Sequence, residues 1–327
     1  MAQILRTTLI VDEAQTADGV TNFDLPVNPL SIVLLTVKAL NLTGVASYLF
    51  IAGLLNMITN VNIRYRGATI VDGSLADIAM LNAIVTGWWP WQCAGAAADD
   101  AVRSLTVPIC LGRRPYDPNE CFPATRRGDL ILQTTNDVAV TGQDGLILQA
   151  ETVELLDATP SQFLKYTTTS KVYNATGEHD IELPIGNDLL GVLLQGPVVP
   201  ITASYNATFG RTKIQVDNVE AIYSETNWES LHGELLRRTG YPGAMLAHTH
   251  TVNVAASTEG ITRENVNDDT IIDNYAYLDL DPLKDNQYAL KTDGAARVNL
   301  RVNTEAASAT AMRVMPVELV KVGGAAA

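Results

Sequence analysis

Short runs in which apolar and polar residues alternate are the dominant pattern of this chain. Residues 297–302 read Arg-Val-Asn-Leu-Arg-Val, and residues 62–66 read Asn-Ile-Arg-Tyr-Arg. Because successive side chains of a β-strand point to opposite faces of a sheet, this alternation predicts strands with one buried face. Glycine, proline, asparagine and aspartate, which favour turns, separate these runs. The pattern therefore predicts a mainly β protein.

The same order of segments occurs twice. Three segments of the first half have counterparts 158 or 159 residues further along the chain. The matched pairs are residues 5–8 with 164–167, 23–27 with 181–185, and 33–35 with 192–194. A nearly constant spacing of this kind indicates an internal duplication. We therefore expect two domains, residues 1–158 and 159–327.

Each half also contains one segment whose apolar residues recur at helical spacing. A helix is predicted over residues 75–85 with Ser74 as its N-cap, and a second over residues 225–238 with Ser224 as its N-cap. Both segments end at a glycine that is followed by an aromatic residue and a proline, which is a helix stop. These two exits are residues 87–90 and 240–242.

Eight strands are predicted in each half, five before the helix and three after it. The fourth and fifth strands form a hairpin, with its turn expected at Gly67 in the first half and at Gly210 in the second. An apolar stretch at residues 45–57 is too short to span a bilayer of ~30 Å, so a transmembrane helix is not expected there. It is interpreted as an apolar loop that follows the strand at residues 32–40. The predicted fold class is all-β, with two tandem eight-stranded antiparallel jelly rolls, each carrying one helix between its fifth and sixth strands.

Composition narrows the range of functions. The formal net charge is −14 and no basic arm precedes the first strand, so binding to nucleic acid is not expected. The three cysteines, Cys93, Cys110 and Cys121, have no metal-binding spacing and are interpreted as free thiols. No GxSxG, P-loop, GxGxxG or HExxH motif is present. The sequence therefore offers no catalytic motif, although a triad assembled from distant residues is not excluded by it.

Two polar clusters contain residue types that bind metals, but neither has a complete ligand pattern. His248 and His250 alternate as strand ligands would, but the glutamate that a cupin site requires is not at the right distance. Asp279, Asp281 and Asp285 could supply oxygen ligands to Ca²⁺, but they lack the turn glycine of an EF-hand loop. The acidic cluster is interpreted as a solvated turn. No metal and no cofactor is expected.

Three groups of residues are candidates for contacts between subunits. Aromatic residues are enriched at protein interfaces, an exposed apolar patch needs a partner, and basic pairs can meet an acidic neighbour or lipid head groups. The candidates are Trp88, Trp89, Trp91, Tyr48, Leu49, Phe50, Ile51, Arg113, Arg114, Arg126 and Arg127.

The duplication and the order of elements resemble a known family. Two tandem jelly rolls, with the matched segments 23–27 and 181–185, the two helices and their glycine–aromatic–proline exits, resemble the double jelly-roll major capsid proteins of the adenovirus, tectivirus and corticovirus lineage. The resemblance implies a structural coat protein of a tailless icosahedral virus of bacteria or archaea. It further implies homotrimers of pseudo-hexagonal outline that tile the shell, made in the host cytoplasm and located in the virion.

The resemblance also implies a set of partners. These are further copies of the chain, neighbouring capsomers, penton and minor capsid proteins, and an internal lipid membrane. Two alternatives remain open from the residues: a tandem β-sandwich enzyme of the bicupin or glycan amidase type, and a carbohydrate-binding adhesin or spike.

Overall fold

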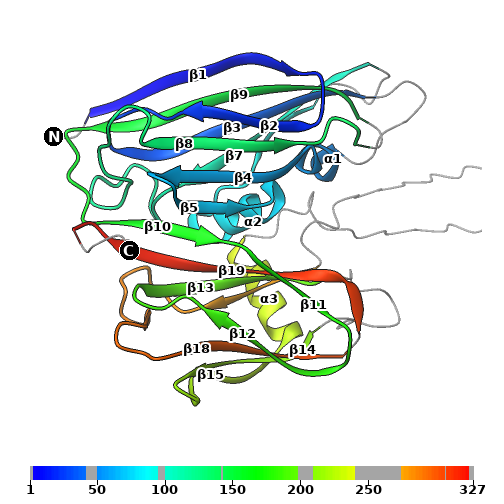
Figure 1. The fold of residues 1–327 in the computed structure, drawn as a ribbon, viewed down its shortest axis with the longest axis vertical. Coiled ribbons are helices and arrows are strands. Elements are labelled where there is room, and N and C mark those ends of the chain that lie inside the picture. The colour runs from blue at the N-terminus through cyan, green and yellow to red at the C-terminus, as the bar shows by residue number, and fades with distance from the viewer. Residues whose placement is uncertain are drawn as a thin grey trace, which may run out of the picture.

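The computed structural model describes residues 3–41, 50–94, 100–140, 143–197, 209–239, 274–305 and 307–323. Strands dominate these residues (Figure 1). The N-terminal half comprises β1 (Gln3–Gln15), β2 (Gly19–Asp24), β3 (Leu30–Asn41), α1 (Phe50–Asn56), β4 (Ile58–Tyr65), β5 (Ala68–Gly73), α2 (Leu75–Thr86), β6 (Trp91–Ala94), β7 (Val102–Cys110), β8 (Leu130–Asn136) and β9 (Gln143–Leu156). The C-terminal half comprises β10 (Gln162–Thr167), β11 (Thr169–Tyr173), β12 (Gly177–Leu183), β13 (Asp188–Gln195), β14 (Phe209–Val216), β15 (Val219–Asn227), α3 (Trp228–Arg238), β16 (Tyr275–Asp279), β17 (Leu290–Lys291), β18 (Val298–Thr304) and β19 (Ser308–Lys321).

The strands form three sheets with a repeated order. The N-terminal half supplies a five-stranded sheet, β1-β9-β3-β7-β6, and the C-terminal half supplies a four-stranded sheet, β12-β18-β14-β15. A ten-stranded sheet joins the halves in the order β16-β13-β19-β10-β5-β4-β8-β2, with β11 on β19 and β17 on β13. Among the described strands every pairing is antiparallel except β10 with β5. The predicted mainly antiparallel β architecture is confirmed.

Both hairpins that precede a helix use the same turn. Arg66 and Gly67 have φ values of 49° and 86°, and Asp217 and Asn218 have values of 49° and 67°. Two consecutive positive φ angles are the signature of a type I′ turn, whose twist matches that of the strands. The prediction of a turn at Gly210 is wrong, because Gly210 lies inside β14 and the turn falls at the other end of that strand.

The predicted helix boundaries are accurate for α2 but not for α3, and α1 was not predicted. α2 begins where expected, with the Ser74 hydroxyl accepting a hydrogen bond from the Asp77 amide at 3.1 Å, and it ends at Gly87 with φ 77°. α3 begins later than predicted: β15 continues to Asn227, so Asn227 and not Ser224 is the N-cap. The expected loop at residues 45–57 contains α1, because Leu54 and Leu55 bury against the core as a helical turn.

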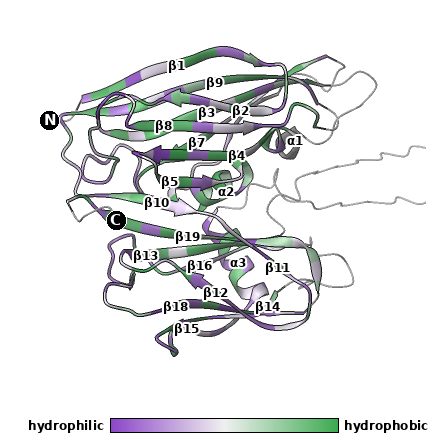
Figure 2. Cartoon of the chain, viewed as in Figure 1, coloured by the Kyte–Doolittle hydropathy of each residue, from purple (hydrophilic) through white to green (hydrophobic). Residues whose placement is uncertain are grey.

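Two large hydrophobic cores organise the molecule. One lies within the C-terminal half and includes Trp228 of α3 and Phe209 of β14, whose rings stack with centroids 4.9 Å apart. The other fills the N-terminal half and extends across the junction to Tyr166, Tyr277 and Leu319 of the C-terminal half. Apolar segments accordingly concentrate inside both halves and along the strands that join them (Figure 2).

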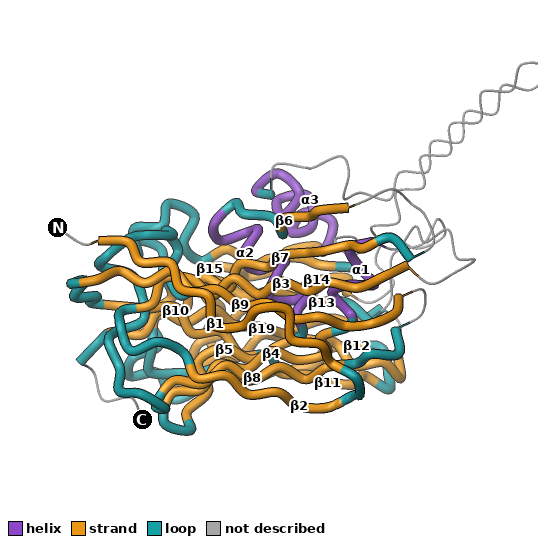
Figure 3. The backbone as a smooth tube through the Cα atoms, turned by 90° about the horizontal axis from the view of Figure 1, so that it is seen from above, coloured by secondary structure: helices purple, strands orange, loops and turns teal. Residues whose placement is uncertain are grey.

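The strands run alongside one another through both halves, so their turns collect at two ends of the molecule (Figure 1). β1 begins and β19 ends at the same end. α2 and α3 lie on the same side of the sheets when the molecule is seen from above (Figure 3). Of the helices in the described residues, none has the length and apolar character needed to cross a membrane.

Candidate functional site at the junction of the two halves

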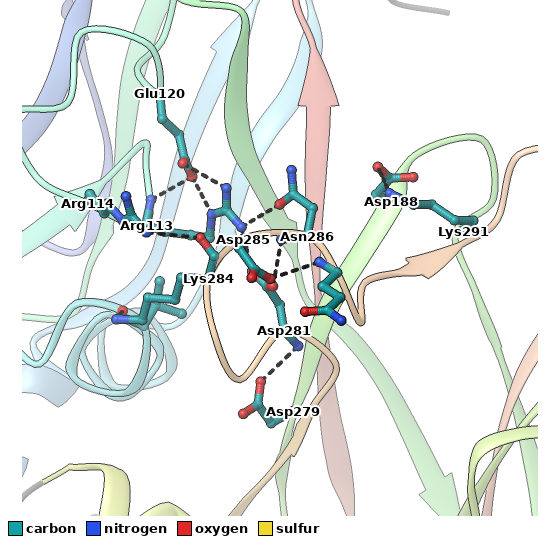
Figure 4. Close-up of polar contacts among 12 residues, drawn as sticks. Arg113, Arg114, Glu120, Asp188, Asp279, Asp281, Lys284, Asp285, Asn286 and Lys291 are labelled. Carbon is teal, nitrogen blue, oxygen red and sulfur yellow. Dashed lines mark hydrogen bonds and ion pairs between the residues drawn. The ribbon is translucent and has the colours of Figure 1, made fainter.

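Arg113, a predicted contact residue between subunits, is buried at the junction of the halves. It lies just after β7, and its side chain is 6% exposed. Its Nε and Nη2 donate to the two carboxylate oxygens of Glu120 at 2.8 and 3.0 Å, and its Nη1 donates to Asp281 and Asn286 (Figure 4). Burial opposes the charge of Arg113, but Glu120 and Asp281 raise its pKa above the ordinary value. Arg113 therefore joins a loop of one half to a loop of the other.

The acidic cluster is not the solvated turn that the sequence suggested. Asp279 and Asp281 are 6% and 4% exposed, and only Asp285 is on the surface. Asp281 pairs with Arg113, and Asp279 pairs with Arg238 at the end of α3. Desolvation raises the pKa of the Asp279 carboxyl despite the nearby guanidinium. These carboxylates neutralise arginines inside the protein.

Lys284 adds a third cation to this cluster. Its ammonium donates to the main-chain oxygen of Val85 at 2.5 Å, so it connects the C-terminal half to the last turn of α2. Burial lowers its pKa, as do the positive charges of Arg238, Arg114 and Arg113. Lys284 is in turn held by the exposed Arg114, which donates to its carbonyl at 3.2 Å.

A second polar cluster, built around a buried aspartate and a half-buried arginine, joins the halves beside α2. Asp77 is 1% exposed and sits in the first turn of α2, where the helix dipole favours a negative charge. Arg313 of β19 donates to its two oxygens at 2.6 and 2.9 Å, and the Tyr275 hydroxyl donates to it at 2.5 Å. Burial raises the pKa of Tyr275 well above its ordinary value, so it remains a neutral donor.

The predicted tryptophans have different environments. Trp89 donates from Nε1 to the Thr239 carbonyl at 2.9 Å, so it is used within the chain to hold the end of α3. Trp88 packs against a small apolar cluster formed by residues of β3, β7 and β9 in the five-stranded sheet. Its ring centroid lies 6.0 Å from that of Trp91 and 5.9 Å from that of Tyr116. Trp91 and Tyr116 are 44% and 42% exposed. These three rings form an aromatic surface that no described part of the chain covers fully.

The remaining candidates are placed as follows. Arg126 and Arg127 are exposed in the loop before β8. Phe50 and Ile51 form the start of α1, while Tyr48 and Leu49 lie outside the described residues. His248 and His250 also lie outside the described residues.

Sequence reasoning missed Glu120, Asp77, Tyr275 and Arg313. The duplication contains one signal for Arg113 and Asp281. Arg113 follows β7 and Asp281 follows β16, which are equivalent strands of the two halves, so both residues lie at the same end of the molecule. Nothing comparable marks Asp77, because an acidic residue in the first turn of a helix is expected for capping alone. Within the described residues, no group of three potential ligands could hold a metal ion.

Comparison with solved structures identifies the fold that these strands form. No family model and no curated protein sequence matches the chain. Among solved structures, the STIV MCP, a major capsid protein, is similar over 98% of this chain and 97% of its own, with a TM-score of 0.63 and 14% identity. The major capsid protein of Bacteriophage PM2 is similar over 99% of both chains, with a TM-score of 0.58 and 13% identity. The chain has the double jelly-roll fold.

A further match supports the same fold. A chain in the atomic structure of Sulfolobus Turreted Icosahedral Virus gives a TM-score of 0.65 at 13% identity, covering 98% of this chain and 91% of that one. At these identities the likeness concerns the fold alone.

Proposed function

We propose that the chain is the major capsid protein of a tailless icosahedral virus, a structural protein and not an enzyme. The observation that carries this proposal is the likeness to major capsid protein structures over 98% or more of this chain. The likeness extends through both halves and their junction, so it concerns the whole architecture and not one sandwich. Neither a tandem sandwich enzyme nor an adhesin is favoured by any comparable feature of the described residues.

We infer that each half is a complete jelly roll, with residues 1–158 forming the first and 159–327 the second. The strand orders support this division. β1-β9-β3-β7 and β10-β19-β13-β16 correspond strand for strand, as do β2-β8-β4-β5 and β12-β18-β14-β15. In each half the helix, α2 or α3, follows the fifth of these strands. α1 and β6 belong to the first half alone among the described elements.

Self-association follows from this proposal. Three copies would present six similar lobes and so approximate a hexagon, which allows capsomers to tile a shell in the virion. The aromatic surface of Trp88, Trp91 and Tyr116 is our candidate for contact with a neighbouring copy or capsomer, because aromatic residues dominate the energetics of interfaces. Penton and minor capsid proteins are further partners. The net charge of −14 argues against direct contact with the genome.

An internal lipid membrane is proposed to face the end of the molecule at which β1 begins and β19 ends. The turns that follow β2, β12 and β16 lie at this end (Figure 1). They contain Val27, Ile185, Leu283 and Tyr288, which are 42–57% exposed. The loop before β8, which contains the exposed Arg126 and Arg127, reaches the same end. Apolar and basic side chains at one end of the molecule suit an interface with anionic lipid.

The oligomeric state of the purified full-length chain tests the proposal. Light scattering coupled to size-exclusion chromatography is expected to give the mass of three chains, and negative-stain images are expected to show particles of hexagonal outline. A chain that remains monomeric at all concentrations would contradict the proposal. Saturable turnover of a glycan or small-molecule substrate by a monomer would favour the enzyme alternative.

A further inference from the structure

Within one chain, the two halves are joined by a parallel strand contact. β5, the last strand before the helix of the N-terminal half, pairs with β10, the first strand of the C-terminal half. Val71 lies opposite Tyr166 and Asp72 opposite Thr167, and the Thr168 amide donates to the Asp72 carbonyl at 2.8 Å. This contact makes the ten-stranded sheet continuous across the junction.

The internal duplication identifies the strands equivalent to β5 and β10. β15 is the last strand before the helix of the C-terminal half, and β1 is the first strand of the N-terminal half. Arg6 lies opposite Val153 as Tyr166 lies opposite Val317, so the ladders align Arg6 with Tyr166. In the hairpins, Ala221 lies opposite Ile214 as Val71 lies opposite Ile63.

Both of these strands are open edges in a single chain. β1 ends the five-stranded sheet and β15 ends the four-stranded sheet. Ile4 of β1 is 62% exposed, while Leu164, at the equivalent place in β10, is 2% exposed. Val71 of β5 is fully buried, whereas Ala221, its equivalent in β15, is half-buried, and the nearby Val219 and Ile222 are 69% and 56% exposed. Long exposed edges with apolar side chains invite pairing with another chain.

We propose that β15 of one copy pairs in parallel with β1 of a second copy, repeating the contact that β5 makes with β10 within the chain. The inference deepens the proposed function and rests on it. The two strands are different surfaces, so the contact is heterologous and closes into a ring when the rotation per copy permits. A second copy is the expected occupant, because β5 and β10, the strands at the equivalent places of the duplicated fold, already pair with each other within the chain.

The side chains around the equivalent positions are suited to a contact between copies. In the contact between copies, Ser230 takes the place of Asp77, because each is at the same position in its helix. Strand pairing likewise matches Thr106 with Tyr275 and Gln149 with Arg313. Ser230 is exposed, and Thr106 and Gln149 are half-buried. Uncharged polar groups can leave water and meet a partner at far lower cost than a buried ion pair. The contact between copies is thus open to assembly after each chain has folded.

An edge substitution tests the pairing. Ile222→Lys places a charge on the exposed edge of β15, where lysine blocks strand pairing without entering a core. Val20→Lys is the matched control, because Val20 is 57% exposed on β2, an edge strand with no part in the proposed contact. We expect Ile222→Lys to lose the three-chain mass while keeping its circular dichroism spectrum and melting temperature. Val20→Lys is expected to retain both the mass and the fold.

Cross-linking between copies tests the geometry. Chains carrying Thr7→Cys alone are co-expressed with differently tagged chains carrying Ile222→Cys alone, and a short thiol-reactive cross-linker is added. Every chain in this experiment also carries Cys93→Ser, so that the remaining native thiols, Cys110 and Cys121, are both buried. A covalent dimer bearing both tags is expected, at a yield well above that of Cys93→Ser chains without the two new cysteines.

The outcomes separate this inference from the proposed function. A trimer that survives Ile222→Lys and gives no mixed cross-link overturns the β15–β1 pairing and leaves the capsid proposal standing. A wild-type chain that is monomeric overturns both. Loss of the trimer in Ile222→Lys, with a mixed cross-link in the paired cysteine variants, supports both.

Discussion

Replacing Arg113 by alanine should strongly destabilise the protein. The substitution removes the cation that lies between Glu120 and Asp281, whose side chains are 5% and 3% exposed. Two carboxylates would then be buried without a cation, each keeping one backbone amide donor. Breaking a buried ion pair by removing one member costs about 3–5 kcal/mol in the free energy of unfolding. Because Arg113 binds both carboxylates and Asn286, we expect Arg113→Ala to lie within that range.

Arg114→Ala is the matched control. Its side chain is exposed and makes one hydrogen bond, to the Lys284 carbonyl, so its loss should change stability by less than about 0.5 kcal/mol. Unfolding in urea, followed by tryptophan fluorescence, measures both variants. The m-value reports whether each variant starts from an equally compact state. A loss below about 1 kcal/mol in Arg113→Ala, with an unchanged m-value, would refute the argument.

The same cluster and a tight glycine give two further predictions. The first is Asp279→Asn. In wild type the pKa of the Asp279 carboxyl is raised above 3.8 by folding, so protonation of this group stabilises the folded state at low pH, and this stabilisation is lost as the pH rises through the raised pKa. We therefore expect the stability of wild type, relative to the variant, to fall over that pH range. Urea unfolding at a series of pH values checks this, and a difference that stays constant or grows with pH would contradict it. For Gly191→Ala, the new Cβ would collide with the Tyr277 hydroxyl and lie 2.9 Å from the Leu278 carbonyl, so we expect a loss of about 1–3 kcal/mol by thermal or urea unfolding. Gly19→Ala, whose Cβ meets nothing within 4 Å, is the control, and equal stability of the two variants would exclude the collision.

Much of the fold was predictable because the chain repeats itself. The matched segments fall on equivalent strands, and α2 starts at the predicted cap because Ser74 satisfies a free amide at the helix start. The hairpin of the C-terminal half was misplaced because Gly210 resembles a turn residue, whereas the structure uses it where β14 bulges against β18. A Cβ at Gly210 would meet only the side chain of the exposed Glu305, which can move aside, so glycine at this position is not a sign of a turn.

The junction was far less predictable. Arg113 and Asp281 are 168 residues apart, and a sequence pattern contains no information on such pairs unless the fold is known. The basic pair at residues 113 and 114 reads as two equivalent surface charges. The structure separates them, because the chain turns Arg113 inward against Glu120 while Arg114 remains in solvent. Burial, which decides their roles, is a property of the assembled halves.

The hydrophobic core that crosses the junction has a consequence for synthesis on the ribosome. The N-terminal half packs against Tyr166, Tyr277 and Leu319, and Leu319 lies in β19, which is translated after every other described strand. A nascent chain that has not yet reached β19 therefore leaves apolar surface of the N-terminal half exposed. The first jelly roll is expected to remain loosely packed until β19 has been translated, and then to consolidate together with the second. Products truncated before β19 would thus expose apolar surface that chaperones and proteases recognise.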